Sequence, residues 1–199
     1  EMVTGIDLVK EQIRVASGEK LSFTQNDIQP AGHAIECRIY AEDGFNNFAP
    51  STGILSDVYF PSGLGVRMDE GVRTGQEITP YYDPLLGKLI TWGNDRQTAL
   101  QRMIRALDEC HIAGIETSIP FCIMVFRHKT FQEGKYSTHT LDVIKDELLR
   151  DLTIHKEEQI LAARIGAVHL HQKCKPESIS SVNYQLTNWS ITGRKEELR

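Results

Sequence analysis

Long hydrophobic runs are missing from this sequence of 199 residues. Hydrophobic residues make up 40% of the chain and charged residues 25%, and no stretch approaches the roughly 18 apolar residues that a membrane-spanning helix requires. Basic clusters are missing too. The net charge is -5, whereas binding to nucleic-acid phosphates requires gathered Lys and Arg side chains. We therefore expect a soluble globular protein that binds neither membrane nor nucleic acid.

Paired cysteines are also absent, because Cys37, Cys110, Cys122 and Cys174 are scattered without a CxxC motif. This spacing argues against a zinc site and against a thioredoxin-like redox site. The first residues lack the basic, apolar and small-residue order of a secretory signal peptide, and we interpret them as a cut through a larger protein. We predict reduced cysteines, no metal ion bound by the chain itself, and a cytoplasmic location.

The first half of the sequence changes from helical spacing to alternation. Residues 4–17 carry apolar side chains at helical spacing and are followed by Gly18, which predicts an amphipathic helix with a glycine cap. Residues 33–40 alternate instead, which predicts a half-buried strand. The two faces of this strand are His33, Ile35, Cys37 and Ile39, and Ala34, Glu36, Arg38 and Tyr40.

The later elements predict an α+β fold, an antiparallel β-sheet flanked by helices. Glycine and proline divide residues 49–75 into short strands, which favours an antiparallel meander. Further elements are expected as a strand over 85–92, a helix capped by Asn94 or Asp95, a helix opened by Ser118 and Pro120, a helix capped by Ser137 or Thr138, and a helix over 155–173. We place the end of the main domain near residue 148.

Common catalytic motifs are missing: the sequence contains no GxSxG, no HExxH and no P-loop lysine motif. Three dense clusters remain instead, each with charged residues inside a predicted strand. They read GHAIECRIYAED at 32–43, GLGVRMD at 63–69 and YYDPLLGKL at 81–89.

In this order and spacing, the clusters resemble the carboxyl-terminal domain of biotin carboxylase, whose patterns are GHAxExRxxAEDP, PSxGxI, GVRxD and YYDxxxxKL. The resemblance extends to FAPSTGI at 48–54 and FQEG at 131–134, and it covers nearly 150 residues. It implies three parts: the last helix of an ATP-grasp core at 1–20, the biotin carboxylase carboxyl-terminal domain at 21–148, and a linker with the start of a following domain at 149–199.

The resemblance also implies a ligase reaction in which ATP and bicarbonate give carboxyphosphate, and biotin on a carrier domain is then carboxylated. Biotin, ATP and Mg²⁺ would be the cofactors, with the magnesium ligands outside this chain, so that the fragment alone is inert. The implied partners are a biotin carboxyl carrier domain, a carboxyltransferase subunit of an acyl-CoA carboxylase and a second copy in a homodimer. The alternatives are a fragment of pyruvate carboxylase and a non-catalytic assembly module.

Arg38 matches the family arginine that contacts the ureido oxygen of biotin. A guanidinium stays charged and has directional donors, so it suits an oxygen on which negative charge develops. The alternative is a surface arginine paired with Glu36. Asp83 lies in an aromatic turn where a lone buried charge would be costly, and we predict that it orients Arg38. For Asp83 the alternative is a turn-capping role. Tyr82 is predicted to lie beside biotin, and the alternative is a buried core position.

Four further residues match family positions. Thr138 and His139 fall where the last helix of the family approaches the adenine of ATP, although a helix cap and an exposed histidine are the alternatives. Leu64 and Arg67 fall where bacterial members form a two-fold dimer contact. Leu64 replaces a phenylalanine that is common there.

Overall fold

The computed structural model describes residues 1–44 and 46–173 of the chain. The chain divides into two units, Glu1–Lys156 and Glu157–Arg199, and the sheet and the candidate site both lie in the first. Cys174 lies outside the described residues, as do residues 184–192, whose weak alternation in the sequence suggests a strand.

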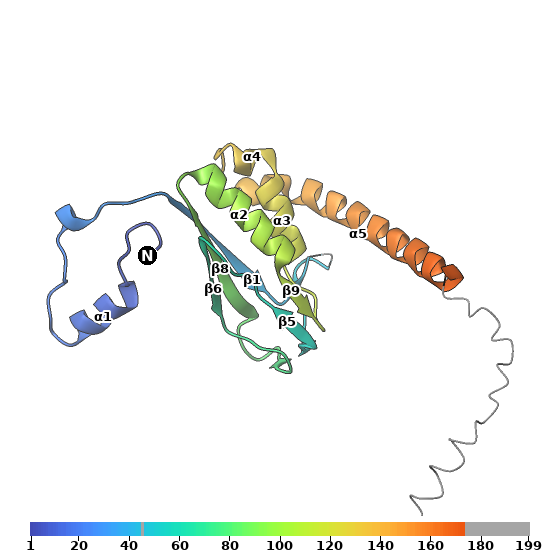
Figure 1. Ribbon diagram of the computed structural model, residues 1–199, viewed down its shortest axis with the longest axis horizontal. Coiled ribbons are helices and arrows are strands. Elements are labelled where there is room, and N and C mark those ends of the chain that lie inside the picture. The colour runs from blue at the N-terminus through green and yellow to red at the C-terminus, as the bar shows by residue number, and fades with distance from the viewer. Residues whose placement is uncertain (45, 174–199) are drawn as a thin grey trace, which may run out of the picture. The chain divides into compact units, whose positions relative to one another are not determined.

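A three-stranded antiparallel sheet forms the centre of the first unit (Figure 1). Its strand order is β1 (His33–Tyr40), β8 (Leu85–Gly93) and β6 (Val66–Glu70). In β1 the side chains of Ile35, Cys37 and Ile39 are buried, whereas Glu36 and Arg38 are exposed. The predicted alternation is confirmed, because strand side chains point to opposite faces in turn.

Helix α2 (Arg96–Glu109) covers the apolar face of this sheet. The Asp95 carboxylate accepts a hydrogen bond from the amide of Thr98 at 2.7 Å and so provides the predicted cap. The buried Thr91 hydroxyl on β8 donates to the Ala99 carbonyl at 2.9 Å and ties the sheet to the helix. The face of α2 that packs on the sheet consists of Ala99, Leu100, Met103, Ala106 and Leu107.

The short strands do not form the expected meander. Among the described residues, only β2 (Glu42–Asp43) and β3 (Ala49–Pro50) pair as neighbours in the sequence. The other pairs join distant segments: β4 (Gly53–Ile54) with β7 (Glu77–Ile78), and β5 (Asp57–Tyr59) with β9 (His111–Ala113). Glycine and proline spacing marks where strands end, but it does not specify their partners.

Two helices after α2, α3 and α5, begin close to the predicted positions, and the short α4 between them was not predicted. Helix α3 (Ile119–Arg127) is followed by α4 (Lys129–Gln132) and α5 (Thr140–Lys173). The hydroxyl of Ser118 accepts a hydrogen bond from the Tyr40 amide at 3.0 Å instead of capping α3. Before the sheet come α1 (Leu8–Ala16) and the 3-10 turn η1 (Gln25–Asp27).

Helix α5 differs from the expected pattern, because it continues through residues 149–154, where the sequence predicts a helix end. Neither glycine nor proline occurs between Tyr136 and Gly166, so nothing in this stretch breaks the helix. The division into parts at 20/21 and 148/149 stays a prediction.

Candidate functional site

The open face of the central sheet carries most of the predicted site residues. Alternation places Glu36 and Arg38 of β1 on the face opposite α2. In the register, Arg38 lies beside Lys88 of β8, and Lys88 lies beside Asp69 of β6. Two cations therefore sit side by side on neighbouring strands. Because like charges directly opposite are unfavourable, this arrangement favours nearby anions.

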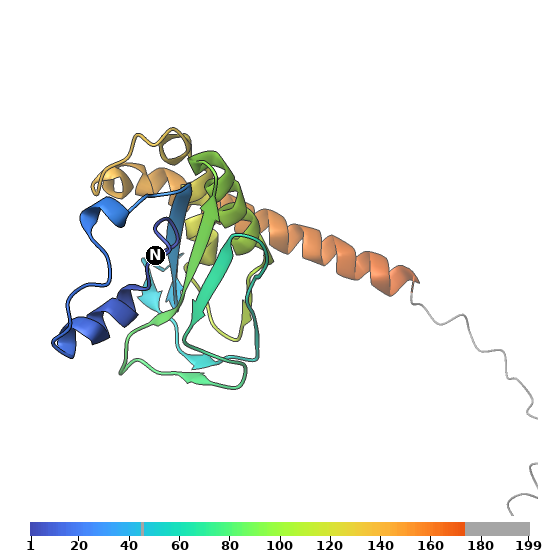
Figure 2. The ribbon, with the colours of Figure 1, turned by 60° about the vertical axis from the view of Figure 1, so that its left-hand side comes forward.

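The N-terminal segment lies against this open face (Figure 2). A cavity of about 520 Å³ separates the two, with Glu36, Lys88 and Ile90 on the sheet side and Met2 and Gln12 on the other side. Its lining therefore combines both signs of charge with apolar surface. A ligand that has an apolar part and a polar end able to carry negative charge matches such a lining.

Arg38 stands on the open face with its side chain 60% exposed. Its Nε lies 3.2 Å from Oε1 of Glu36, which is itself 44% exposed. Hydrogen bonds to Tyr40 and to Glu36 raise the pKa of Arg38, so its guanidinium is charged at every working pH. The arginine therefore presents a fixed positive charge to solvent.

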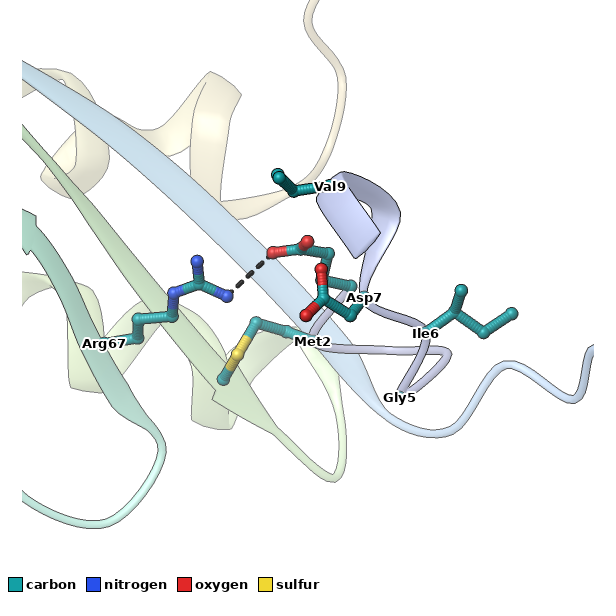
Figure 3. Close-up of a pocket in the computed structure, with 7 residues that line it drawn as sticks. Met2, Gly5, Ile6, Asp7, Val9 and Arg67 are labelled. Atoms are coloured by element: carbon teal, nitrogen blue, oxygen red, sulfur yellow. Dashed lines mark hydrogen bonds and ion pairs between the residues drawn. The ribbon is translucent and has the colours of Figure 1, made fainter. Parts of the chain in front are cut away.

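Arg67 is held by charges from two different parts of the chain. Its Nη1 donates to Glu1 at 2.7 Å, and its Nε and Nη2 donate to Asp69 at 2.7 and 3.2 Å. Figure 3 shows Arg67 reaching toward the N-terminal segment across a second cavity of about 570 Å³. The hydrogen bond from Arg67 lowers the pKa of Asp69, and Lys88, at 3.7 Å from Asp69, adds to this effect.

The proposed dimer residues differ in their surroundings. Leu64 is 83% exposed, which suits a contact with a second copy, whereas Arg67 is engaged with Glu1 and Asp69 within the chain. The dimer contact at these two residues stays a prediction.

The turn before β8 is more exposed than its aromatic residues suggest. Tyr82 is 86% exposed and Tyr81 is 93% exposed, so the buried core position considered for Tyr82 is wrong. Asp83 is exposed as well, and its Oδ1 accepts a hydrogen bond from the Leu85 amide at 2.8 Å. This bond is the geometry that a turn-capping role predicts. The acidic partner of Arg38 is Glu36 and not Asp83.

Thr138 and His139 are both exposed in the turn that leads into α5. The turn is fixed at Ser137, whose amide donates to Oγ1 of Thr140 at 2.7 Å and whose hydroxyl accepts from the His139 amide at 3.3 Å. Nδ1 of His139 lies 3.5 Å from Asp142. Both residues are accessible to a ligand, and their role in nucleotide binding stays a prediction.

Sequence reasoning missed the participation of Glu1, Asp69 and Lys88 in the open face. Asp69 and Lys88 were signalled, because each is a charged residue within one of the quoted clusters. Glu1 gave no signal, because it meets Arg67 across 66 residues of sequence.

Two kinds of feature are missing from the described part of the chain. No helix there is both long and apolar enough to cross a membrane. No group of three or more His, Cys, Asp or Glu side chains in residues 1–44 and 46–173 is placed to hold a metal ion.

Known proteins are similar to this chain in sequence and in fold. A pyruvate carboxylase subunit of Methanothermobacter thermautotrophicus is 48% identical over 174 residues, 87% of this chain and 35% of that protein. Biotin carboxylase of a Nostoc species is 52% identical over 138 residues, 69% of this chain and 31% of that protein. The biotin carboxylase domain dimer of Hydrogenobacter thermophilus 2-oxoglutarate carboxylase, solved with MgADP, ADP and bicarbonate, matches with a TM-score of 0.72 at 44% identity.

That structural match covers 75% of this chain and 33% of the solved one. The chain thus spans about a third of the length of the relatives it matches. The family model of the biotin carboxylase C-terminal domain matches residues 36–143, which include the open face of the sheet and reach the first turn of α5. The chain belongs to the biotin carboxylase C-terminal domain family.

Proposed function

We propose that this chain supplies the biotin-facing wall of a biotin carboxylase, an ATP-dependent ligase that carboxylates biotin on a carrier domain. The observation that carries the proposal is the position of Arg38. It stands on the open sheet face, on the edge strand β1 and beside Lys88 of the central strand β8. Its guanidinium is exposed, and a cavity of about 520 Å³, lined by neighbouring residues, lies against the same face.

The residues of the open face fit the ureido end of biotin. When biotin is bound, its ureido ring supplies the nitrogen that accepts the carboxyl group. The guanidinium of Arg38 would hold the ureido oxygen, where negative charge accumulates once that nitrogen loses its proton. A fixed cation that needs no reorganisation lowers the energy of that charge. Ile90, on the same sheet face as Arg38, adds apolar surface to the cavity of about 520 Å³.

The remaining assignments follow the same proposal. Thr138 and His139 would approach the adenine of ATP, and Leu64 and Arg67 would contact a second copy. Asp83 and Tyr82 would lie at the edge of the biotin site, with Asp83 acting through the turn that it caps. The phosphate-binding groups and the magnesium ligands would be supplied by residues outside this chain. The carrier domain, the carboxyltransferase and a cytoplasmic location belong to the proposal as well.

The final carboxyl acceptor has two candidates. The family resemblance, with the residues that follow the domain, favoured an acyl-CoA carboxylase. The alternative, a carboxylase for a 2-oxo acid, is supported by the 48% identity with the Methanothermobacter pyruvate carboxylase subunit, which extends over 174 residues against 138 for the Nostoc biotin carboxylase. Purifying the full-length protein with its carboxyltransferase and measuring ATP consumption with acyl-CoA or with pyruvate distinguishes the two.

The test of the proposed function is an assay of the full-length protein. We expect ATP hydrolysis that depends on bicarbonate, and transfer of labelled bicarbonate to free biotin. ATP hydrolysis that ignores bicarbonate, together with no labelled biotin, would refute the proposal.

The isolated chain provides a second test. We expect it to bind MgATP no more tightly than millimolar, because only the adenine edge of the nucleotide site would be present. Titration calorimetry measures this directly. Micromolar binding would contradict the assignment of the phosphate-binding groups to residues outside the chain, and it would favour a different nucleotide site within it.

A further inference from the structure

Arg96, the first residue of α2, grips the end of a different helix. Its Nη2 donates to the Phe131 carbonyl at 2.6 Å, and its Nη1 donates to the Gln132 carbonyl at 3.0 Å. These two carbonyls belong to the last turn of α4, where the backbone acceptors of a helix lack partners within the helix. The Phe131 carbonyl also accepts a hydrogen bond from the Gly134 amide at 3.1 Å. The planar fork of a guanidinium can satisfy two neighbouring carbonyls at once, which a lysine ammonium matches poorly.

Two aromatic rings complete the grip. The guanidinium carbon of Arg96 lies 5.1 Å from the centre of the Phe131 ring and 5.7 Å from that of Tyr136. The two rings stack on each other with centroids 4.5 Å apart and planes 11° apart. Both distances from Arg96 are within the range of a cation–π interaction. Arg96 therefore fixes Tyr136 as well as α4.

The segment that follows is short and fixed at its other end. Residues 137–139 separate Tyr136 from Thr140, the first residue of α5. At that end the Ser137 amide donates to the Thr140 hydroxyl at 2.7 Å. Thr138 and His139 thus lie between Tyr136, whose ring contacts Arg96, and the first turn of α5. Their position depends on both attachments.

We propose that Arg96 is a positioning residue for nucleotide binding: through Phe131 and Tyr136 it sets the place of Thr138 and His139. This inference rests on the proposed function, in which these two residues meet adenine. Arg96 acts through the segment that it holds and does not itself touch the nucleotide. Without the contacts of Arg96 to α4 and to the two rings, residues 137–139 are no longer held in place. Nucleotide binding then weakens, while the chemical step is unaffected.

The experiment uses the full-length protein and measures bicarbonate-dependent ATP hydrolysis at varied ATP. For Arg96→Met we expect the KM for ATP to rise about tenfold, with kcat and the KM for bicarbonate within about twofold of the parent. Arg96→Lys should resemble Arg96→Met, because lysine keeps the charge but not the fork. Arg105→Met is the matched control, since Arg105 lies on the same helix and pairs only loosely with Glu109 at 3.7 Å.

Substitutions at Tyr136 test the same grip without disturbing α2. Tyr136 is 49% exposed, so its replacement leaves the core intact. Tyr136→Ala should raise the KM for ATP as Arg96→Met does, and Tyr136→Phe should restore the parent value because it keeps the stacked ring. A merely structural role for Arg96 would lower the melting temperature and kcat together and leave the KM for ATP unchanged.

The outcomes separate the two proposals. If the parent protein hydrolyses ATP with bicarbonate but Arg96→Met and Tyr136→Ala keep the parent KM for ATP, the positioning role is overturned and the proposed function stands. If the parent protein itself shows no bicarbonate-dependent hydrolysis, the proposed function fails first. A raised KM for ATP in Arg96→Met and Tyr136→Ala, but not in Tyr136→Phe or Arg105→Met, supports the inference.

Discussion

Replacing Arg38 with alanine in the full-length protein separates a catalytic arginine from a surface ion pair. The Arg38 side chain is 60% exposed and its partner Glu36 is 44% exposed, and exposed ion pairs contribute little to stability. We therefore expect the melting temperature of Arg38→Ala to shift by less than about 2 °C. The cost of the substitution should appear in catalysis.

The expected catalytic loss follows from the charge that Arg38 would stabilise. Removing one donor from a site of developing negative charge lowers kcat by about 100-fold to 1000-fold, so carboxylation of free biotin should fall by that factor. Bicarbonate-dependent ATP hydrolysis should survive, because Arg38 is assigned to the ureido oxygen and not to the nucleotide. Transfer of labelled bicarbonate to biotin and release of phosphate are measured on the same sample.

Two controls make this result specific. Glu36→Gln removes the charged partner of Arg38 and leaves the guanidinium on the face, so biotin carboxylation should stay near the parent rate. Arg73→Ala removes an exposed arginine from the loop between β6 and β7. If Arg38→Ala carboxylates biotin at the parent rate, Arg38 is a surface residue and the assignment is wrong.

Three further predictions concern stability and reactivity. Leu89→Ala should lower the free energy of unfolding by about 2–5 kcal/mol in urea titration, because Leu89 is fully buried in the central strand; a loss below about 1 kcal/mol would contradict the core position. Burial raises the pKa of the Cys110 thiol to about 11 from 9.0, so alkylation followed by mass spectrometry should be slow at pH 8. The contribution of the buried, protonated thiol to the free energy of unfolding should be lost as pH rises from 9 through 11. Fast alkylation of Cys110 at pH 8 would contradict the raised pKa. The hydrogen bond from Arg67 lowers the pKa of Asp69 below 3.8, so the pair's contribution to the free energy of unfolding is present above pH 3.8 and is lost as pH falls further. Asp69→Asn should flatten the acid side of the plot of unfolding free energy against pH. An unchanged acid side would show that the pair contributes nothing.

The parts of the fold that the sequence predicted depend on local patterns. The faces of residues 33–40 followed from strict alternation, and the N-cap at Asp95 followed from a side chain that bonds within three residues. The pairing of β5 with β9 could not be predicted in this way, because it joins residues more than 50 positions apart. The ion pair of Glu1 with Arg67 has the same character. Such contacts arise from the assembled sheet and have no local signature.

The continuous helix α5 shows the limit of reasoning from composition. A domain end was placed near residue 148 because Leu148 is the last apolar position of the helix predicted from Ser137 or Thr138, although neither glycine nor proline follows there to end a helix. A helix ends at a cap, a glycine or a proline, and polar residues alone do not end it. The absence of a breaker was the stronger signal.

The turn at Asp83 shows how a residue can influence the site without touching it. Aromatic neighbours suggested burial, but large apolar side chains are often exposed at turns, and the carboxylate instead bonds the amide of Leu85 at 2.8 Å. That bond sets where β8 begins. Leu85 pairs with Tyr40 across a register shift that follows Ile39, and the same register places Lys88 beside Arg38. Because a slip of one residue would turn every side chain of β8 to the other face, the cap at Asp83 helps keep Lys88 on the open face. An Asp83 substitution should therefore act on Arg38 through the strand register. Asp83→Asn can keep the cap, so it should reduce biotin carboxylation less than Asp83→Ala does. Equal losses in the two variants would point to a direct role of the charge.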